Sequence, residues 1–139
     1  MKDQFEQISL KTGFMKHNGG LLFKTISENE YQFKTTILET HLNAAGIAHG
    51  GYIAAVVDAG AGTAAHRSAD QNPCVTISLE LKFISAVKLG QELIGKTKIQ
   101  KKTKSMVFLT CELTAGNKIV ATASGVWKIL KLSGAGPGG

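Results

Sequence analysis

The chain has 139 residues, a length that fits one domain built on one hydrophobic core. Hydrophobic residues make up 43% of it and charged residues 19%, and no apolar run approaches the roughly 20 residues of a membrane span, so the composition predicts a soluble globular protein that does not cross a membrane. The formal net charge of +6 suits an anionic partner such as nucleic acid, an anionic lipid surface or a phosphorylated cofactor, although solubility alone also accounts for a charge of this size.

The termini and the cysteines favour a cytoplasmic protein. No apolar segment follows the first residues, MKDQFEQ, so no signal peptide is expected. Cys74 and Cys111 lie far apart within apolar strand patterns, which predicts reduced core thiols and no disulfide. Neither has a neighbouring histidine or a helix N-terminus to lower its pKa, which argues against a catalytic thiol.

In chain order, residues 1–13 carry Phe5 and Ile8 at helical spacing before Gly13 and predict a short amphipathic helix. From Gly20 two runs, LLFKTIS and YQFKTTIL, predict a hairpin with its turn at residues 27–30. A loop over residues 39–48 then leads to the only long helical pattern, which starts at Gly51 and ends near Ser68.

This helix has two unlike faces and one carboxylate. At 3.6 residues per turn the bulky face holds Ile53, Val56, Val57 and Ala64, and the small face holds Gly51, Ala54, Ala55, Asp58, Ala61, Gly62 and Ala65. The residues three and four positions from Asp58 are all Gly or Ala, so no cation on the helix pairs with it. Either Asp58 meets a hydroxyl or backbone N–H from elsewhere, or lies at a partly wet edge, or it is a catalytic acid facing a slot that small side chains keep open.

The second half of the chain reads as consecutive strands. Val75, Ile77, Leu79, Leu81 and Phe83 alternate with polar residues, which predicts a strand with one core face and places Thr76 on the other side. Strand-like runs follow at residues 92–101, 105–114 and 118–131, joined by tight turns at 102–104 and 115–117.

Together these elements predict an α+β fold in which a curved antiparallel β-sheet wraps around one long central helix. Residues 1–132 are expected to form this single domain, and residues 133–139 a flexible glycine-rich tail. The unpaired edges of such a sheet make dimerisation by edge pairing plausible.

Three other kinds of site are disfavoured. Residues 90–97, GQELIGKT, match the phosphate-binding pattern G-x-x-x-x-G-K-[ST], but the residues that follow are strand-like where that loop requires a helix. The histidines have no metal-ligand spacing, so no metal site is expected. The lysines at 96–104 lack interleaved aromatic residues for base stacking, so nucleic acid is not expected as a partner.

The start of the long helix carries His49–Gly50–Gly51. Glycines there allow a group to approach the backbone closely, and free N–H groups with the positive end of the helix dipole favour a polarised carbonyl, as in an oxyanion hole. The alternative is a glycine-rich N-cap without a ligand. Asp58 lies roughly 10 Å further along the axis, too far to serve the same carbonyl within one helix, but it could meet the glycine loop of a second subunit.

These residues resemble the hotdog-fold acyl-CoA thioesterases, in particular the branch of the phenylacetate pathway. The resemblance runs from about the first hairpin to the last strand and rests on Asn43, then His49–Gly50–Gly51 six residues on, then Asp58 nine residues after the histidine. The turn AVKLG at residues 86–90 is similar to the family's P-x-K-x-G turn, with Ala86 where proline is frequent.

The resemblance implies a mechanism. Asp58 would activate water as general base or attack the thioester carbonyl itself, with Asn43 positioning the water or the acid. The Gly50 N–H, helped by His49, would polarise the thioester oxygen, and Thr76 would bond the water or the substrate.

It also implies partners. Gly51 and the basic hairpin Lys101, Lys102, Thr103, Lys104 and Ser105 would contact substrate and CoA. The sites would lie between subunits of a homodimer or homotetramer, and no metal or tightly bound cofactor is implied.

Two other functions stay open at this point. An acyl-CoA hydratase or dehydratase uses the same fold but needs a catalytic histidine paired with an acid, which His49 in a glycine turn fits poorly. A non-catalytic acyl-CoA-binding protein would bind the ligand without turnover. The sequence does not fix the acyl group, and acyl-carrier-protein thioesters suit the basic surface as well as CoA thioesters.

Overall fold

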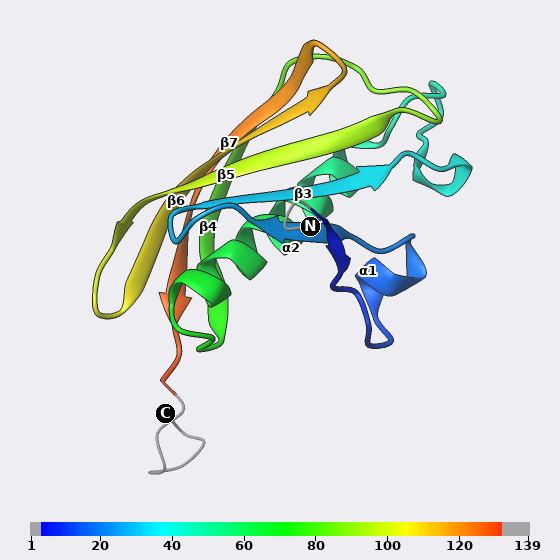
Figure 1. Ribbon diagram of the computed structural model, residues 1–139. Coiled ribbons are helices and arrows are strands. Elements are labelled where there is room, and N and C mark those ends of the chain that lie inside the picture. The colour runs from blue at the N-terminus through cyan, green and yellow to red at the C-terminus, as the bar shows by residue number, and fades with distance from the viewer. Residues whose placement is uncertain (1–3, 132–139) are drawn as a thin grey trace.

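A computed structural model describes residues 4–131 as one antiparallel sheet that curves around a long helix (Figure 1). The strand order is β1-β2-β3-β5-β6-β7-β4, and every pairing is antiparallel. The strands are β1 (Glu6–Gln7), β2 (Leu22–Thr25), β3 (Glu30–Thr36), β4 (Cys74–Phe83), β5 (Glu92–Lys102), β6 (Met106–Ala115) and β7 (Lys118–Ile129). The helices are α1 (Phe14–His17) and α2 (Gly50–Ser68), with a 3-10 turn, η1, at Glu39–His41.

The predicted α+β architecture is therefore confirmed, with one strand more than expected. Residues 1–13 do not form the predicted amphipathic helix in the part that is described: Glu6 and Gln7 pair with Phe23 and Leu22 as strand β1, and a short helix begins only after Gly13. The open edge of β2 offers this segment backbone partners, and the Gln7 side-chain oxygen accepts the N–H groups of Ser9 and Leu21. These long-range bonds outweigh a weak local helical tendency.

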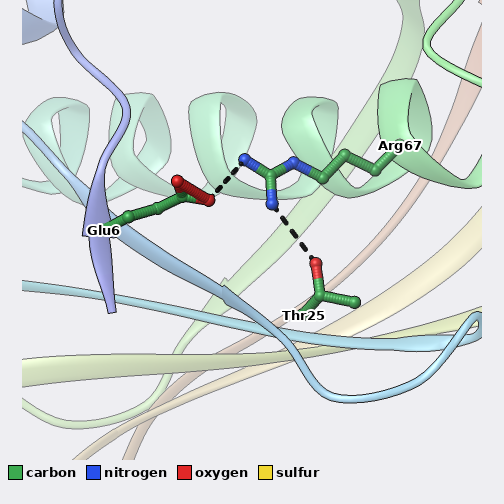
Figure 2. Close-up of polar contacts among 3 residues, drawn as sticks. All are labelled: Glu6, Thr25 and Arg67. Carbon is green, nitrogen blue, oxygen red and sulfur yellow. Dashed lines mark hydrogen bonds and ion pairs between the residues drawn. The ribbon is translucent and has the colours of Figure 1, made fainter. Parts of the chain in front are cut away.

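Arg67, near the end of α2, links the N-terminal segment to this helix. Its guanidinium donates to a Glu6 carboxylate oxygen at 3.1 Å and to the Thr25 hydroxyl at 3.3 Å (Figure 2). The same group lies over the Phe23 ring, 4.7 Å from its centroid. One side chain thus joins β1 and β2 to the helix.

Glycine allows α2 to lie close to the sheet. The Phe33 ring is fully buried between the helix and β5, and a Cβ atom would lie 2.3 Å from it at Gly60 and 2.2 Å at Gly95. Either alanine would require the ring or the helix to move, because interiors are close-packed. The curved sheet covers part of the small face of α2: Ala61 and Ala65 are 0% exposed, whereas Asp58 on the same face is exposed.

Strand β4 contains a β-bulge that changes which residues face the helix. Thr76 pairs with Trp127 and Ser78 with Val126, so Ile77 is the extra residue. Beyond the bulge, Leu79 pairs with Gly125, on the same side of β7 as the buried Trp127. Because directly paired residues share a face, Thr76 lies on the helix side together with Leu79.

The prediction that Val75, Ile77 and the residues that follow form one core face of β4 is therefore wrong for the part of the strand up to the bulge. Val75 and Ile77 are 45% and 50% exposed, and they lie on a strand whose outer edge is unpaired among the described residues.

The GQELIGKT segment lacks the structure of a phosphate-binding loop. Its residues 92–97 belong to β5, so no helix follows the pattern. Within residues 4–131, no group of three or more His, Cys, Asp or Glu side chains could hold a metal ion. None of the helices described there is long and apolar enough to span a membrane. The predicted tail at 133–139 lies outside the described residues.

Candidate active site

Asp58 lies at the middle of α2 and has one side-chain partner in the described chain. The Thr76 hydroxyl donates to Asp58 Oδ1 at 2.7 Å. The bulge in β4 makes this contact possible, because without it Thr76 would face away from the helix. The carboxylate thus meets a hydroxyl, as one interpretation of the sequence expected, yet its residue stays exposed to solvent.

A groove of about 550 Å³ runs beside Asp58 and Thr76. Its lining residues come from α2, from the start of β4, including Cys74, and from the N-terminal segment, including Ile8 and Met15. Gly62 and Trp127 also line the groove. Most of these groups are apolar, so the groove suits a hydrophobic chain or ring next to the carboxylate.

The start of α2 presents one free backbone donor. His49 is the N-cap residue, and its Nδ1 accepts the Gly51 N–H at 2.8 Å. The N–H groups of Tyr52 and Ile53 donate to the His49 carbonyl. Across residues 4–131 the Gly50 N–H makes no hydrogen bond, which leaves it available at the positive end of the helix dipole.

Asn43 organises the loop that leads to this donor. Its side-chain oxygen accepts the N–H groups of Ala45 at 2.9 Å and Ile47 at 3.2 Å. Asn43 and Gly50 line a second pocket of about 310 Å³, to which Phe83 of β4 also contributes. In the single chain Asn43 therefore lies with the amide donor and has no bond to Asp58.

The two pockets share no lining residue. Asp58 and Gly50 are eight residues apart on one helix, roughly 12 Å along its axis at the usual rise. One chain therefore carries two separate groups of candidate residues, called below the acid half (Asp58 and Thr76) and the amide half (Asn43, His49 and Gly50).

The basic hairpin between β5 and β6 lies near the C-terminal end of α2, away from the N-terminal end of this helix (Figure 1). Lys101, Thr103, Lys104 and Ser105 are exposed, and the Thr103 hydroxyl accepts the N–H groups of Ser105 and Met106. The Lys102 ammonium donates to the Ser68 carbonyl in the last turn of α2. Lys102 thus has a capping role that the sequence did not suggest.

Both cysteines are free thiols within the described chain. Burial raises the pKa of the Cys111 thiol to about 12. Cys74 lines the acid-half groove, and burial raises the pKa of its thiol too. Each is protonated at neutral pH, so Asp58 is the better candidate for the chemical step.

Comparison with known families identifies the class. The model of the thioesterase superfamily matches residues 45–122, a span that contains His49, Asp58 and Thr76. The chain belongs to the thioesterase superfamily, whose members are thioester hydrolases with the hotdog fold.

Two curated relatives align over much of the chain. “Putative esterase PA0474” of Pseudomonas aeruginosa is 36% identical over 92 residues, which cover 66% of this chain and 69% of the relative. Human acyl-coenzyme A thioesterase 13 is 31% identical over 85 residues, covering 60% of this chain and 61% of the human protein.

Solved structures share the fold. The PaaI protein of the Escherichia coli phenylacetic acid degradation operon has a TM-score of 0.73 at 18% identity and covers 80% of each chain. A hypothetical thioesterase of Streptococcus pneumoniae, solved with coenzyme A, has a TM-score of 0.74 at 19% identity over 80% of this chain and 86% of its own. The family and fold expected from the sequence are confirmed, and PaaI proteins are among the structures that share the fold.

Sequence reasoning missed two residues that line the groove of the acid half, Trp127 and His66. Trp127 lines its groove because β7 pairs with β4, a long-range pairing that no local pattern reveals. His66 also lines the groove, with Nδ1 2.8 Å from the Asn72 carbonyl oxygen. Its position two turns after Asp58 on the same helix was a usable signal.

Proposed function

We propose that this thioesterase hydrolyses acyl-CoA thioesters to a free acid and CoA, with an aryl or phenylacetyl type of acyl group as one candidate. The observation that carries the proposal is the hydrogen-bonded Asp58–Thr76 pair beside an apolar groove. The curated acyl-coenzyme A thioesterase 13 and the structural neighbour solved with coenzyme A support this class of substrate.

In the proposed reaction the Thr76 hydroxyl holds Oδ1 of Asp58 and leaves Oδ2 to accept a proton from water. The oxygen of that water forms a bond to the thioester carbonyl carbon, and the Gly50 N–H stabilises the negative charge that develops on the carbonyl oxygen. When the carbon–sulfur bond breaks, the sulfur leaves as thiolate and receives the proton from Asp58. Direct attack by Asp58, followed by hydrolysis of the anhydride, is the other route.

The proposal includes a second copy of the chain. The acid half and the amide half lie in separate pockets of one chain, so a complete site requires Asp58 of one subunit and Gly50 of another. Strand β4 supports such pairing, because its outer edge is free in the described sheet and it exposes Val75 and Ile77. We propose a homodimer as the smallest active unit, and a homotetramer built from two dimers.

Asn43 is proposed to position the attacking water across this interface, and Gly51 to let the substrate approach the helix start. The exposed hairpin residues Lys101, Lys104, Thr103 and Ser105 are proposed to meet the CoA phosphates, while Lys102 is held at the helix end. We propose that the protein is cytoplasmic, because Cys74 and Cys111 are both free thiols.

The test is release of free CoA thiol from a panel of straight-chain, aryl and phenylacetyl thioesters, including acyl-carrier-protein thioesters. We expect turnover of at least one CoA thioester class. Hydration of a crotonyl-type thioester without thiol release would favour the hydratase function, and calorimetric binding without any turnover would favour a binding protein. Either result would contradict the proposal.

The shared site is tested by mixing two variants that are each inactive, Asp58→Asn and Gly50→Pro, and allowing the subunits to exchange. A mixed dimer rebuilds one intact site, so roughly a quarter of wild-type activity returns from an equal mixture. No recovery after proven exchange would place both groups in the same chain's site.

A further inference from the structure

One buried ionisable side chain near the amide half has no part in the proposed reaction. His41 is the last residue of η1 and is 2% exposed. It lies two positions before Asn43, on the loop that leads to Gly50. A polar ring buried to this extent needs a partner for each nitrogen.

Both ring nitrogens of His41 have such partners. The Leu38 N–H donates to Nδ1 at 2.9 Å, and Nε2 lies 2.6 Å from the Asn18 carbonyl oxygen. Because an amide N–H only donates and a carbonyl only accepts, Nδ1 is the acceptor and Nε2 carries the proton. The ring therefore connects the residue before η1 to the end of α1.

The same residue contacts the chain on both sides of Gly50. The His41 carbonyl accepts the His49 N–H at 2.8 Å. The His41 ring stacks on the Tyr52 ring with centroids 3.6 Å apart and planes 9° apart, and the Tyr52 hydroxyl lies 3.2 Å from the Thr35 hydroxyl. His41 thus contacts His49 on one side of the free Gly50 N–H in the sequence and Tyr52, two residues after Gly50, on the other.

We propose that His41 is a positioning residue for the Gly50 N–H; the inference rests on the proposed function of that N–H as oxyanion donor. A donor of this kind contributes only when it lies within about 3 Å of the developing oxyanion. Rotation of the His49–Gly50 peptide would move the hydrogen off this position. His41 acts through its contacts to His49 and Tyr52 and does not itself touch the substrate.

The test is His41→Phe, which keeps a flat ring against Tyr52 and removes both ring hydrogen bonds. We expect kcat to fall by about tenfold, because the N–H is misplaced but not lost, while KM changes by less than about twofold. Amide hydrogen exchange over residues 43–51 should become faster. Should this variant not fold, His41→Gln retains one polar partner and should show the same kcat effect in weaker form.

Ser68→Ala is the matched control. Its buried hydroxyl donates to the Ala65 carbonyl at the far end of α2, so its loss should lower Tm without changing kcat or exchange over residues 43–51. Wild-type kcat in folded His41→Phe, or a loss confined to KM, would overturn the inference. If the wild type itself releases no thiol, the proposed function fails, and unchanged exchange over residues 43–51 in His41→Phe would then overturn the positioning role separately.

Discussion

The two proposed half-sites are built in opposite ways. The acid half consists of two side chains, Asp58 and Thr76, on an open surface, joined by one hydrogen bond. The amide half depends on a backbone N–H, and its loop is held by Asn43, the His49 cap and the buried His41. Side chains on the surface can be exchanged without disturbing the fold, whereas a backbone donor is only as well placed as the loop that carries it.

The largest expected effect comes from removing the acid. Asp58→Asn keeps the shape and the exposed position, and we expect kcat to fall by about 100- to 10,000-fold, the usual contribution of a general base. Thiol release measures it, with circular dichroism to show an intact fold. Asp70→Asn, the same change just beyond α2, is the control. A comparable loss of kcat in Asp70→Asn would mean that the effect comes from the change in net charge and not from the position of Asp58.

Removing the Gly50 N–H should lower kcat slightly less than removing the Asp58 carboxylate. Gly50→Pro deletes the N–H at the first helical position, where proline is tolerated, and His49 already has the backbone angles that precede proline, φ −65° and ψ 133°. We expect kcat to fall about 100- to 1,000-fold. Gly50→Ala retains the N–H, and its Cβ would lie 3.6 Å from the Phe83 ring, an ordinary contact. Equal losses in the two variants would indicate crowding and not a lost donor.

Thr76 should have a smaller effect, because it orients the acid and does not replace it. Thr76→Val removes the 2.7 Å hydrogen bond, and we expect kcat to fall about tenfold. Thr76→Ser retains the hydroxyl and should stay close to the wild type. A pH–rate profile that is identical in Thr76→Val and wild type, with no loss of kcat, would remove Thr76 from the acid half.

The smallest effect is expected at the basic hairpin. Lys101→Ala with Lys104→Ala should raise KM for CoA thioesters about threefold and leave kcat unchanged, with the difference fading in high salt, because exposed charges are screened. Lys98→Ala, an exposed lysine elsewhere on β5, is the control. Lys102→Ala should instead lower Tm, since its ammonium caps the end of α2. An unchanged KM in the Lys101→Ala, Lys104→Ala variant would mean that CoA binds elsewhere.

The sequence predicted the fold well where a pattern is local. The alternation in β5, β6 and β7 and the 3.6-residue period of α2 depend only on near neighbours, and these elements appear with ends shifted by one or two residues. The N-terminal strand was missed, because β1 exists only through its pairing with β2.

For the candidate site, the sequence supplied candidate residues but not their geometry. The spacing of Asn43, His49 and Asp58 selected them as candidates, yet nothing local indicated that Asn43 bonds its own loop or that Lys102 caps a helix. The sequence did not point to the proposed role of His41, for a similar reason. Its partners lie on η1, at the end of α1 and at the start of α2, and the Asn18 carbonyl is 23 positions away along the chain, so only the folded chain brings them together.

The bulged residue in β4 has a practical consequence for sequence comparison. The extra residue Ile77 shifts the inward–outward alternation of β4 by one position. An alignment guided by hydrophobic alternation alone would therefore place Thr76 on the wrong side of the strand and match it with a solvent-facing position. When relatives are searched for the hydroxyl that serves the acid, a gap of one residue should be allowed just after it. Relatives that lack the extra residue would have to supply that hydroxyl from a neighbouring position.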